Sequence, residues 1–317
     1  MQRLDLSRVL PEEIDSLGHL NVRFYLARID RANQVLLESL GVNGLRGNEV
    51  AAHGPTLRRV DTYCRFQREQ FEGAELSVYG GLLASDDETA RSYFEIRNED
   101  RDQIAATFVT GTLIRDPDSR SGTRFPFDTR HPDPARVISI PEHGKPRSLT
   151  LDLPRTDVPL AELMARIEPS TEIGMTGRRS GRIEAEDCDA RGFLRDDLDI
   201  MFVLFRREAN AADPKSFGPP VLRTDDGHRF GWAMLETRNR EFARPRAGDE
   251  VVWLGADIGI AEKSRRSRRW AFAANTGELL SIHDAVGIAM DLDARRAIQI
   301  PPSIRATLER HYLPEYA

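Results

Sequence analysis

The chain has 317 residues, of which 40% are hydrophobic and 30% are charged, and its formal net charge is −6. The length exceeds that of a typical single domain, and the composition is that of a soluble globular protein. The acidic balance argues against nucleic acid as a partner, because proteins that bind nucleic acid usually present a basic face to the phosphates. A run of about 18 apolar residues, which an integral membrane protein needs, does not occur.

The N-terminus has neither a basic start followed by a continuous apolar stretch nor a small-residue cleavage site, which favours a cytoplasmic location. The two cysteines, Cys64 and Cys188, are too few and too far apart for a disulfide framework or a zinc site of the CxxC kind. We expect neither a metal nor a resident cofactor.

Apolar residues recur at steps of three or four after residue 21, and Gly41 follows where a helix C-cap favours a positive φ. This pattern predicts one amphipathic helix of about five turns. The residues on its apolar face are Val22, Leu26, Ile29, Asn33, Leu36 and Leu40.

Alternating apolar and polar residues then follow in four segments, with polar turns such as FEGAE and NEDRDQ between them. A period of two predicts antiparallel strands joined by hairpins. The segments cover residues 60–66, 76–82, 94–96 and 104–110. The first part of the chain is thus predicted to be a helix followed by a β-meander.

Nine of the 18 prolines fall between Pro117 and Pro169, in a stretch without sustained apolar periodicity. This composition predicts a linker over residues 117–169. The predicted domains are residues 1–116 in front of it and residues 170–317 behind it.

The two predicted domains resemble each other in sequence. The segment DSLGHL at 15–20 aligns with DARGFL at 189–194, an offset of 189 − 15 = 174, and later matches follow at offsets of 175 and 176. Such a small drift over about 100 residues indicates two copies of one unit. In the second copy we expect a helix over 194–205 and strands over 249–258, 268–275 and 278–290. A long helix with one apolar face and a sheet bury those faces against each other.

The order of elements, with DSLGHLNVRFY at the start of the helix, resembles the hotdog fold and, within it, the 4-hydroxybenzoyl-CoA thioesterase-like family of acyl-CoA thioesterases. Asp15, His19, Asn21 and Tyr25 match the family motif, whereas Val22 stands where a second Asn is frequent. The resemblance implies an α+β protein of two tandem hotdog domains, each a long helix wrapped by an antiparallel sheet, that form an intramolecular pseudo-dimer. A homodimer of such pseudo-dimers is a further assembly that it allows.

The second copy retains the acid and the glycine of this motif, as Asp189 and Gly192, but Phe193 replaces the histidine and Arg195 the asparagine. The resemblance therefore implies one working site, in the first copy. It implies catalytic roles for Asp15, His19, Asn21 and Tyr25, with Asp15 as general base or nucleophile. Backbone N–H groups around Phe24 and Tyr25 would stabilise the oxyanion.

A purely structural interpretation of the same residues makes Asp15 a turn former, Asn21 an N-cap and His19 a core histidine. In the catalytic interpretation, by contrast, Gly18 would let the backbone pass close to a ligand. His53 lies between the helix and the first strand of the meander, near the expected acyl pocket, although a turn beside Gly54 and Pro55 also explains it.

A basic cluster, EKSRRSRRW, includes Arg265 and Arg266. It is interpreted either as a solvated turn or as an anchor for the phosphates of coenzyme A, since arginine forks suit phosphate oxygens.

The function expected from the resemblance is hydrolysis of an acyl thioester carried on coenzyme A or on acyl carrier protein, with no cofactor beyond the coenzyme A of the substrate. One alternative is a hotdog enoyl-thioester hydratase or dehydratase, although the G-D-x-N-P-x-H segment of those enzymes is absent. Another is a non-catalytic protein that binds acyl thioesters. Neither a nucleic acid nor a membrane is an expected partner.

Overall fold

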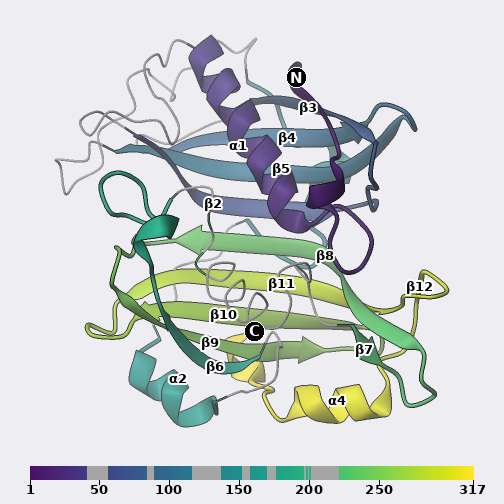
Figure 1. The fold of residues 1–317 in the computed structure, drawn as a ribbon, viewed down its shortest axis with the longest axis vertical. Helices are drawn as coiled ribbons and strands as arrows, with labels where there is room; N and C mark the ends of the chain where they lie inside the picture. The colour runs from purple at the N-terminus through teal and green to yellow at the C-terminus, as the bar shows by residue number, and fades with distance from the viewer. Residues whose placement is uncertain are drawn as a thin grey trace. The chain divides into compact units, whose positions relative to one another are not determined.

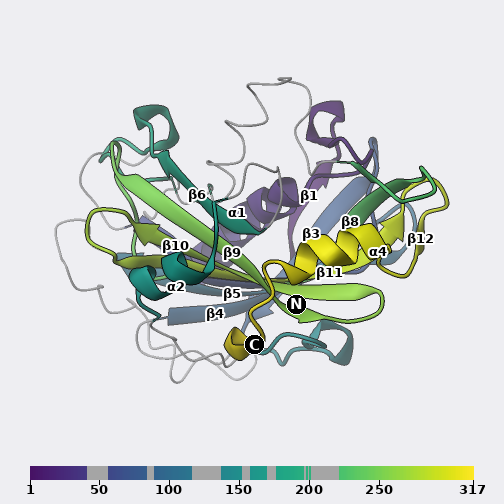
Figure 2. The same cartoon turned by 90° about the horizontal axis from the view of Figure 1, so that it is seen from below.

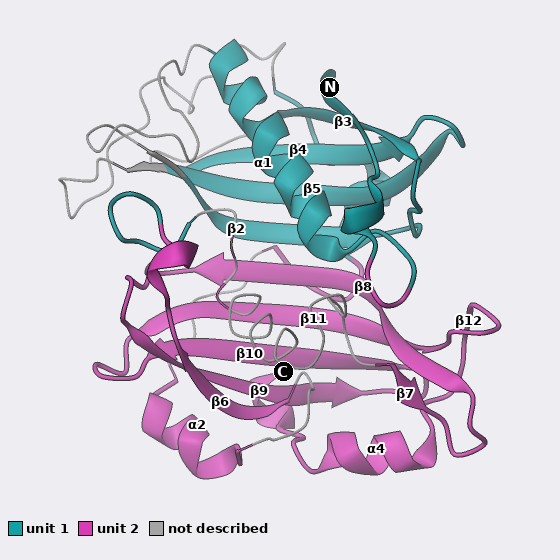
Figure 3. Ribbon diagram, in the orientation of Figure 1, with its two compact units in different colours: residues 1–14, 18–146, 189–197 teal, residues 15–17, 147–188, 198–317 magenta. Residues whose placement is uncertain are grey.

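The computed structural model describes residues 1–40, 56–83, 89–115, 137–151, 158–169, 176–195, 198, 200 and 221–317. The chain divides into two compact units (Figure 3). Unit 1 contains residues 1–14, 18–146 and 189–197, and unit 2 contains residues 15–17, 147–188 and 198–317. Among the described residues, no helix combines the length and the apolar character needed to cross a membrane.

Unit 1 contains one long helix, α1 (Val22–Ser39), and an antiparallel sheet that α1 crosses (Figure 1). The strand order in this sheet is β1-β3-β4-β5-β2. The strands are β1 (Gln2–Arg8), β2 (Thr56–Phe66), β3 (Glu75–Leu82), β4 (Thr89–Asn98) and β5 (Gln103–Arg115). The predicted helix and the four predicted strands are confirmed, and β1 is an additional strand that pairs with β3.

The core of unit 1 lies between α1 and one face of the sheet. Ile29 and Ala32 of α1 are fully buried against Phe94 and Ile96 of β4. The apolar stripe of the helix covers alternate residues of the strands, as the two sequence periods require. The predicted C-cap Gly41 lies outside the described residues.

The other face of this sheet is covered by residues from the stretch predicted as a linker. Val137 bridges to Leu82, and a short 3₁₀ helix, Glu142–Gly144, follows. Arg65, which is buried on β2, donates to the carbonyl oxygens of His143 at 2.8 Å and Lys145 at 3.1 Å. The predicted boundaries at 117 and 169 stay a prediction, and the described residues 137–146 between them pack as part of unit 1.

The long strands of unit 2 are antiparallel and follow the order β6-β9-β10-β11-β8, and two further short strands pair with β8 and β11. The strands are β6 (Gly177–Arg182), β7 (Leu222–Arg223), β8 (Arg229–Glu241), β9 (Glu250–Ile260), β10 (Ser264–Ala273), β11 (Leu279–Asp291) and β12 (Arg296–Ala297). The three strands predicted for the second copy are confirmed as β9, β10 and β11. The helix predicted over 194–205 lies almost wholly outside the described residues.

Two short helices of unit 2 pack on its sheet (Figure 2). Helix α2 (Leu160–Arg166) buries Leu163 in a cluster with Trp270 of β10. Helix α4 (Pro302–Glu309) buries Leu308 against Phe230 of β8.

The predicted duplication is visible in the order and spacing of the elements. Strands β3 and β9 begin at Glu75 and Glu250, an offset of 250 − 75 = 175, and each pairs with the first strand of its own unit. Even an ion pair is repeated, because Arg8–Glu75 at 3.7 Å corresponds to Arg182–Glu250 at 3.5 Å. The chain is an α+β protein built from two hotdog units in tandem.

Candidate active site

The motif residues lie on and directly after a closed loop that precedes α1. We call residues 14–20 the Asp15 loop. A 3₁₀ helix, Pro11–Glu13, leads into it, and Ile14 and Leu20 close it as an isolated β-bridge. The Asn21 N–H donates to the carbonyl oxygen of Glu13 at 2.9 Å, so the start of the helix is tied to the residue before the loop.

Asp15 is half-buried, and its Oδ1 accepts the Leu17 N–H at 2.9 Å. This is the short-range bond by which an aspartate forms a turn and fixes its own side chain. Gly18 follows with φ +80, in the left-handed region that favours glycine. The turn alone thus explains Gly18, whether or not a ligand approaches it.

His19 lies at the end of the Asp15 loop with only 18% of its side chain exposed. Its Nδ1 is 3.3 Å from the carbonyl oxygen of Leu20, and its Nε2 is 3.8 Å from Oε1 of Glu69. The ring is therefore oriented by neighbours on both sides. His19 is half-buried and is not part of the core cluster of unit 1.

Asn21 is the N-cap of α1. Its buried side-chain Oδ1 accepts the Arg23 N–H at 3.1 Å, and its carbonyl oxygen accepts the Phe24 N–H at 3.0 Å. These bonds satisfy N–H groups that a helix start leaves without partners. The N–H of Phe24, expected to face the oxyanion, is therefore already engaged with Asn21.

Tyr25 is in the core of unit 1. Its ring is 3% exposed and meets the Phe66 ring edge-to-face at 5.4 Å. Phe24 is half-buried, and the Arg23 guanidinium lies 4.4 Å from its ring centroid. Packing thus accounts for both aromatic rings, and a catalytic role of Tyr25 stays a prediction.

The sequence prediction did not include Arg28, which is 2% exposed on α1. Its Nη1 and Nη2 donate to the two carboxylate oxygens of Glu13 at 3.0 and 2.7 Å. The signal was available, because a charge at position 28 interrupts the apolar stripe between Tyr25 and Ala32. An arginine at such a position needs a buried partner.

The second copy folds its corresponding loop in the same way. Asp189 Oδ1 accepts the N–H groups of Arg191 at 2.9 Å and Phe193 at 3.1 Å, and Gly192 has φ +80. A 3₁₀ helix, Ala185–Asp187, again leads into it. The turn has thus been retained, while the histidine and asparagine have been replaced.

Of the remaining candidates, His53 lies outside the described residues. Arg265 is in β10, 6% exposed, with its Nε 3.1 Å from Oδ1 of Asp257 and its guanidinium 5.1 Å from the Trp232 ring centroid. Burial raises the pKa of Asp257 to about 6, against the attraction of Arg265 and Arg269. The interpretation as a solvated turn is therefore wrong, because the cluster forms part of a strand.

The phosphate anchor expected at this cluster finds no support in Arg265, whose guanidinium is turned into the interior of unit 2. Arg266, next to it on β10, is half-buried. Arg268 is buried too, and its Nε donates to Asp284 Oδ1 at 2.8 Å. Alternation along the strand distributes these charges to both faces of the sheet, which the sequence run did not reveal.

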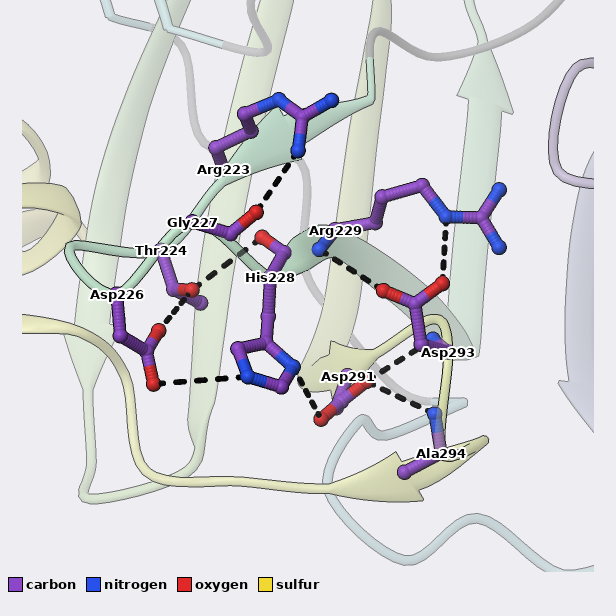
Figure 4. A network of polar contacts seen from close by, with 9 residues as sticks. All are labelled: Arg223, Thr224, Asp226, Gly227, His228, Arg229, Asp291, Asp293 and Ala294. Carbon is purple, nitrogen blue, oxygen red and sulfur yellow. Dashed lines mark hydrogen bonds and ion pairs between the residues drawn. The ribbon is translucent and has the colours of Figure 1, made fainter.

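One group among the described residues has ligand atoms close enough for a metal ion: His228, Asp291 and Asp293, within 4.8 Å of one another (Figure 4). Asp293, however, accepts Arg229 Nε at 2.7 Å and the Arg229 backbone N–H at 3.2 Å. Asp291 Oδ1 accepts the N–H groups of Asp293 and Ala294, each at 2.9 Å. The carboxylate of Asp293 is thus already bound by Arg229, and that of Asp291 by backbone N–H groups of the turn. We therefore assign no metal to the group.

The comparisons with known proteins agree with this architecture. Residues 9–143 match the sequence model of the thioesterase-like superfamily. No curated protein matches the sequence.

Solved structures similar to the chain include a 12:0-ACP thioesterase from Umbellularia californica, at 11% identity and a TM-score of 0.60, covering 91% of this chain and 94% of that one. An acyl-ACP thioesterase from Bacteroides thetaiotaomicron is similar at 9% identity and a TM-score of 0.54, covering 89% of this chain and 96% of that one. At such low identity these similarities establish the fold. The whole chain thus has a double hotdog fold, and the superfamily match of its N-terminal part supports a thioester hydrolase.

Proposed function

We propose that this protein hydrolyses an acyl thioester to a free acid and a thiol, with Asp15 as the general base or the nucleophile. The observation that carries the proposal is the arrangement of Asp15, His19 and Asn21 on one loop and helix start, inside the stretch that matches the thioesterase-like superfamily.

Two routes fit an aspartate at this position. As a general base, Asp15 takes a proton from water, the oxygen of that water adds to the carbonyl carbon, and the C–S bond breaks as the thiol leaves with the proton. As a nucleophile, the Asp15 carboxylate itself adds to the carbonyl carbon, and the C–S bond breaks to release a thiolate. Water then cleaves the resulting anhydride, which frees the acid, restores the Asp15 carboxylate and supplies the proton that converts the thiolate to the thiol. In both routes the Leu17 N–H keeps the carboxylate in one orientation.

The developing negative charge on the thioester oxygen needs a hydrogen-bond donor. His19 is the side chain of the motif that can donate through a ring nitrogen. Since the Phe24 N–H is engaged by Asn21, we assign Asn21 first to starting the helix and so to setting the geometry of its first turn. The Asn21 side chain lies at this same helix start, and it is the third polar group of the motif besides Asp15 and His19.

We propose a substrate whose thiol is a phosphopantetheine, which coenzyme A and acyl carrier protein have in common. Both similar structures named above are thioesterases of acyl carrier protein by their designation. The buried position of Arg265 removes one argument for a coenzyme A phosphate site on β10. The two carriers are therefore to be compared directly with the same acyl groups.

The test is free thiol release from a panel of acyl-CoA and acyl carrier protein thioesters by the wild type, Asp15→Ala and Asp189→Ala. Asp189 is the matched control, because it occupies the same turn in the second copy. We expect Asp15→Ala to lose at least about 100-fold in rate, the usual contribution of a positioned base, and Asp189→Ala to keep most of it.

Three results would contradict the proposal. Loss of activity in Asp189→Ala with full activity in Asp15→Ala would move the site to the second copy. Hydration of crotonyl-CoA without thiol release would make the protein a hydratase. Binding of acyl thioesters without any turnover would make it a carrier or sensor.

A further inference from the structure

We infer that Arg28 is a positioning residue which, through Glu13, fixes the Asp15 loop onto helix α1. The inference rests on the proposed function, because it names a residue required for the same reaction that does not touch the substrate itself.

The guanidinium of Arg28 uses all five of its N–H donors. Two go to the Glu13 carboxylate at 2.7 and 3.0 Å, and one goes from Nε to Ser7 Oγ at 3.0 Å. The last two go to the carbonyl oxygens of Phe24 at 3.0 Å and Arg8 at 3.4 Å. One side chain thus joins β1, the residue before the Asp15 loop and the first turn of α1.

Glu13 is the other half of this connection. Besides Arg28, its Oε2 accepts the Leu10 N–H at 3.0 Å, and its carbonyl oxygen accepts the Asn21 N–H at 2.9 Å. Both ends of the Asp15 loop are therefore tied to Glu13. Asp15 follows Glu13 by only two residues, so the chain can carry it no further than about 7 Å from this fixed point.

The second copy shows which part of this arrangement the turn itself needs. At an offset of 174, Asp187 corresponds to Glu13, Gly181 to Ser7 and Phe202 to Arg28. The turn around Asp189 nevertheless has the same Asp–N–H bond and the same positive-φ glycine as the turn around Asp15. The arginine is therefore not needed to form the turn, and it occurs only in the copy that keeps His19 and Asn21.

Because the turn of the second copy forms without an arginine, we infer that Arg28 determines where the Asp15 loop lies and is not required for the loop to fold. A bidentate arginine–carboxylate pair is geometrically specific, and lysine cannot reproduce it. Because a shift of about 1 Å at a reacting group can cost about 100-fold in rate, a fixed loop has a direct kinetic consequence.

The experiment compares Arg28→Lys, Arg28→Met, and the double variant Arg28→Met with Glu13→Gln. The control is Arg97→Lys, because Arg97 likewise donates two N–H groups, at 2.9 and 2.6 Å, to a fully buried carboxylate, that of Glu95. Thiol release gives kcat and KM, circular dichroism gives the folded fraction and Tm, and hydrogen exchange gives the protection of residues 14–20.

We expect Arg28→Lys to lower kcat by about 10- to 100-fold with KM within about 3-fold of the wild type, while Arg97→Lys keeps kcat. Arg28→Met leaves the half-buried Glu13 carboxylate without its guanidinium partner and lowers Tm. The double variant removes both charges and recovers Tm without recovering kcat. Amides of the Asp15 loop exchange faster in the double variant than in the wild type.

A double variant that regains both Tm and kcat would show that Arg28 acts only on stability, and the inference would be wrong. If the wild type releases no thiol from any substrate, the proposed function fails, and hydrogen exchange still decides about Arg28. Unchanged protection of residues 14–20 in the double variant would overturn the positioning role whatever reaction the protein catalyses.

Discussion

The Nε2 atom of His143 lies 2.6 Å from Oε1 of Glu95, whose side chain is fully buried. Tyr93 Oη donates to the same carboxylate at 3.0 Å, and Arg97 donates to its other oxygen at 2.6 Å. This network lies on the face of the sheet opposite α1, because Phe94, between Tyr93 and Glu95, is in the core with the helix. It holds the segment around His143 to unit 1.

The stability of unit 1 should therefore depend on pH through Glu95. Burial by itself raises the pKa of this carboxyl, but hydrogen bonds from Arg97, His143 and Tyr93 outweigh it and hold the pKa below its ordinary value of 4.5. A carboxyl with a lowered folded-state pKa stabilises the fold above its unfolded-state pKa and loses that contribution as the pH falls through the folded-state pKa.

We expect Glu95→Gln to lower the free energy of unfolding by about 1.5–3 kcal/mol at pH 7, and by less at pH 3, which lies below the ordinary pKa of 4.5 that applies to this carboxyl in the unfolded chain. Urea unfolding of both proteins at pH 7, 5 and 3 measures this difference, with the exposed Glu72→Gln as control. A difference that stays the same at all three pH values would exclude the carboxylate as its cause.

Asn21 offers a way to separate helix capping from chemistry. Asn21→Ala removes the Oδ1 acceptor of the Arg23 N–H and should cost about 1 kcal/mol of stability. Serine is also a good N-cap, so Asn21→Ser should keep the Tm. If Asn21 also holds water or substrate, Asn21→Ser should still release thiol at least about 10-fold more slowly, because removal of one such positioned polar group commonly costs this much. Full activity in Asn21→Ser would reduce Asn21 to a cap.

Gly18 and Gly192 form a matched pair for testing the Asp15 loop. Both have φ +80, so alanine at either position should cost about 1–2 kcal/mol of stability. Since only the first copy has the full motif, we expect Gly18→Ala to slow thiol release and Gly192→Ala to leave the rate per folded molecule unchanged. Equal rate losses in the two variants would mean that both loops take part in the reaction.

The elements that depend on local pattern were predictable from the sequence. The apolar stripe and the N-cap defined α1, alternation defined the strands β2–β5 and β9–β11, and the fixed offset identified the duplication. The edge strands β1 and β6 were missed. Their residues, QRLDLSR and GRRSGR, are mostly polar, and they form strands because β3 and β9 offer them backbone partners.

The polar residues of the candidate site were likewise predictable only in part from the sequence. Sequence spacing brought Asp15, His19 and Asn21 together, because all three lie within one short loop and the helix start that follows it. Only the tertiary structure decided that Arg265 is buried against Asp257, that Tyr25 packs in the core, and that Arg28 holds Glu13. Helix and strand periods depend on neighbours a few residues away, whereas the partner of a buried charge is chosen by packing between distant segments, which sequence spacing alone does not specify.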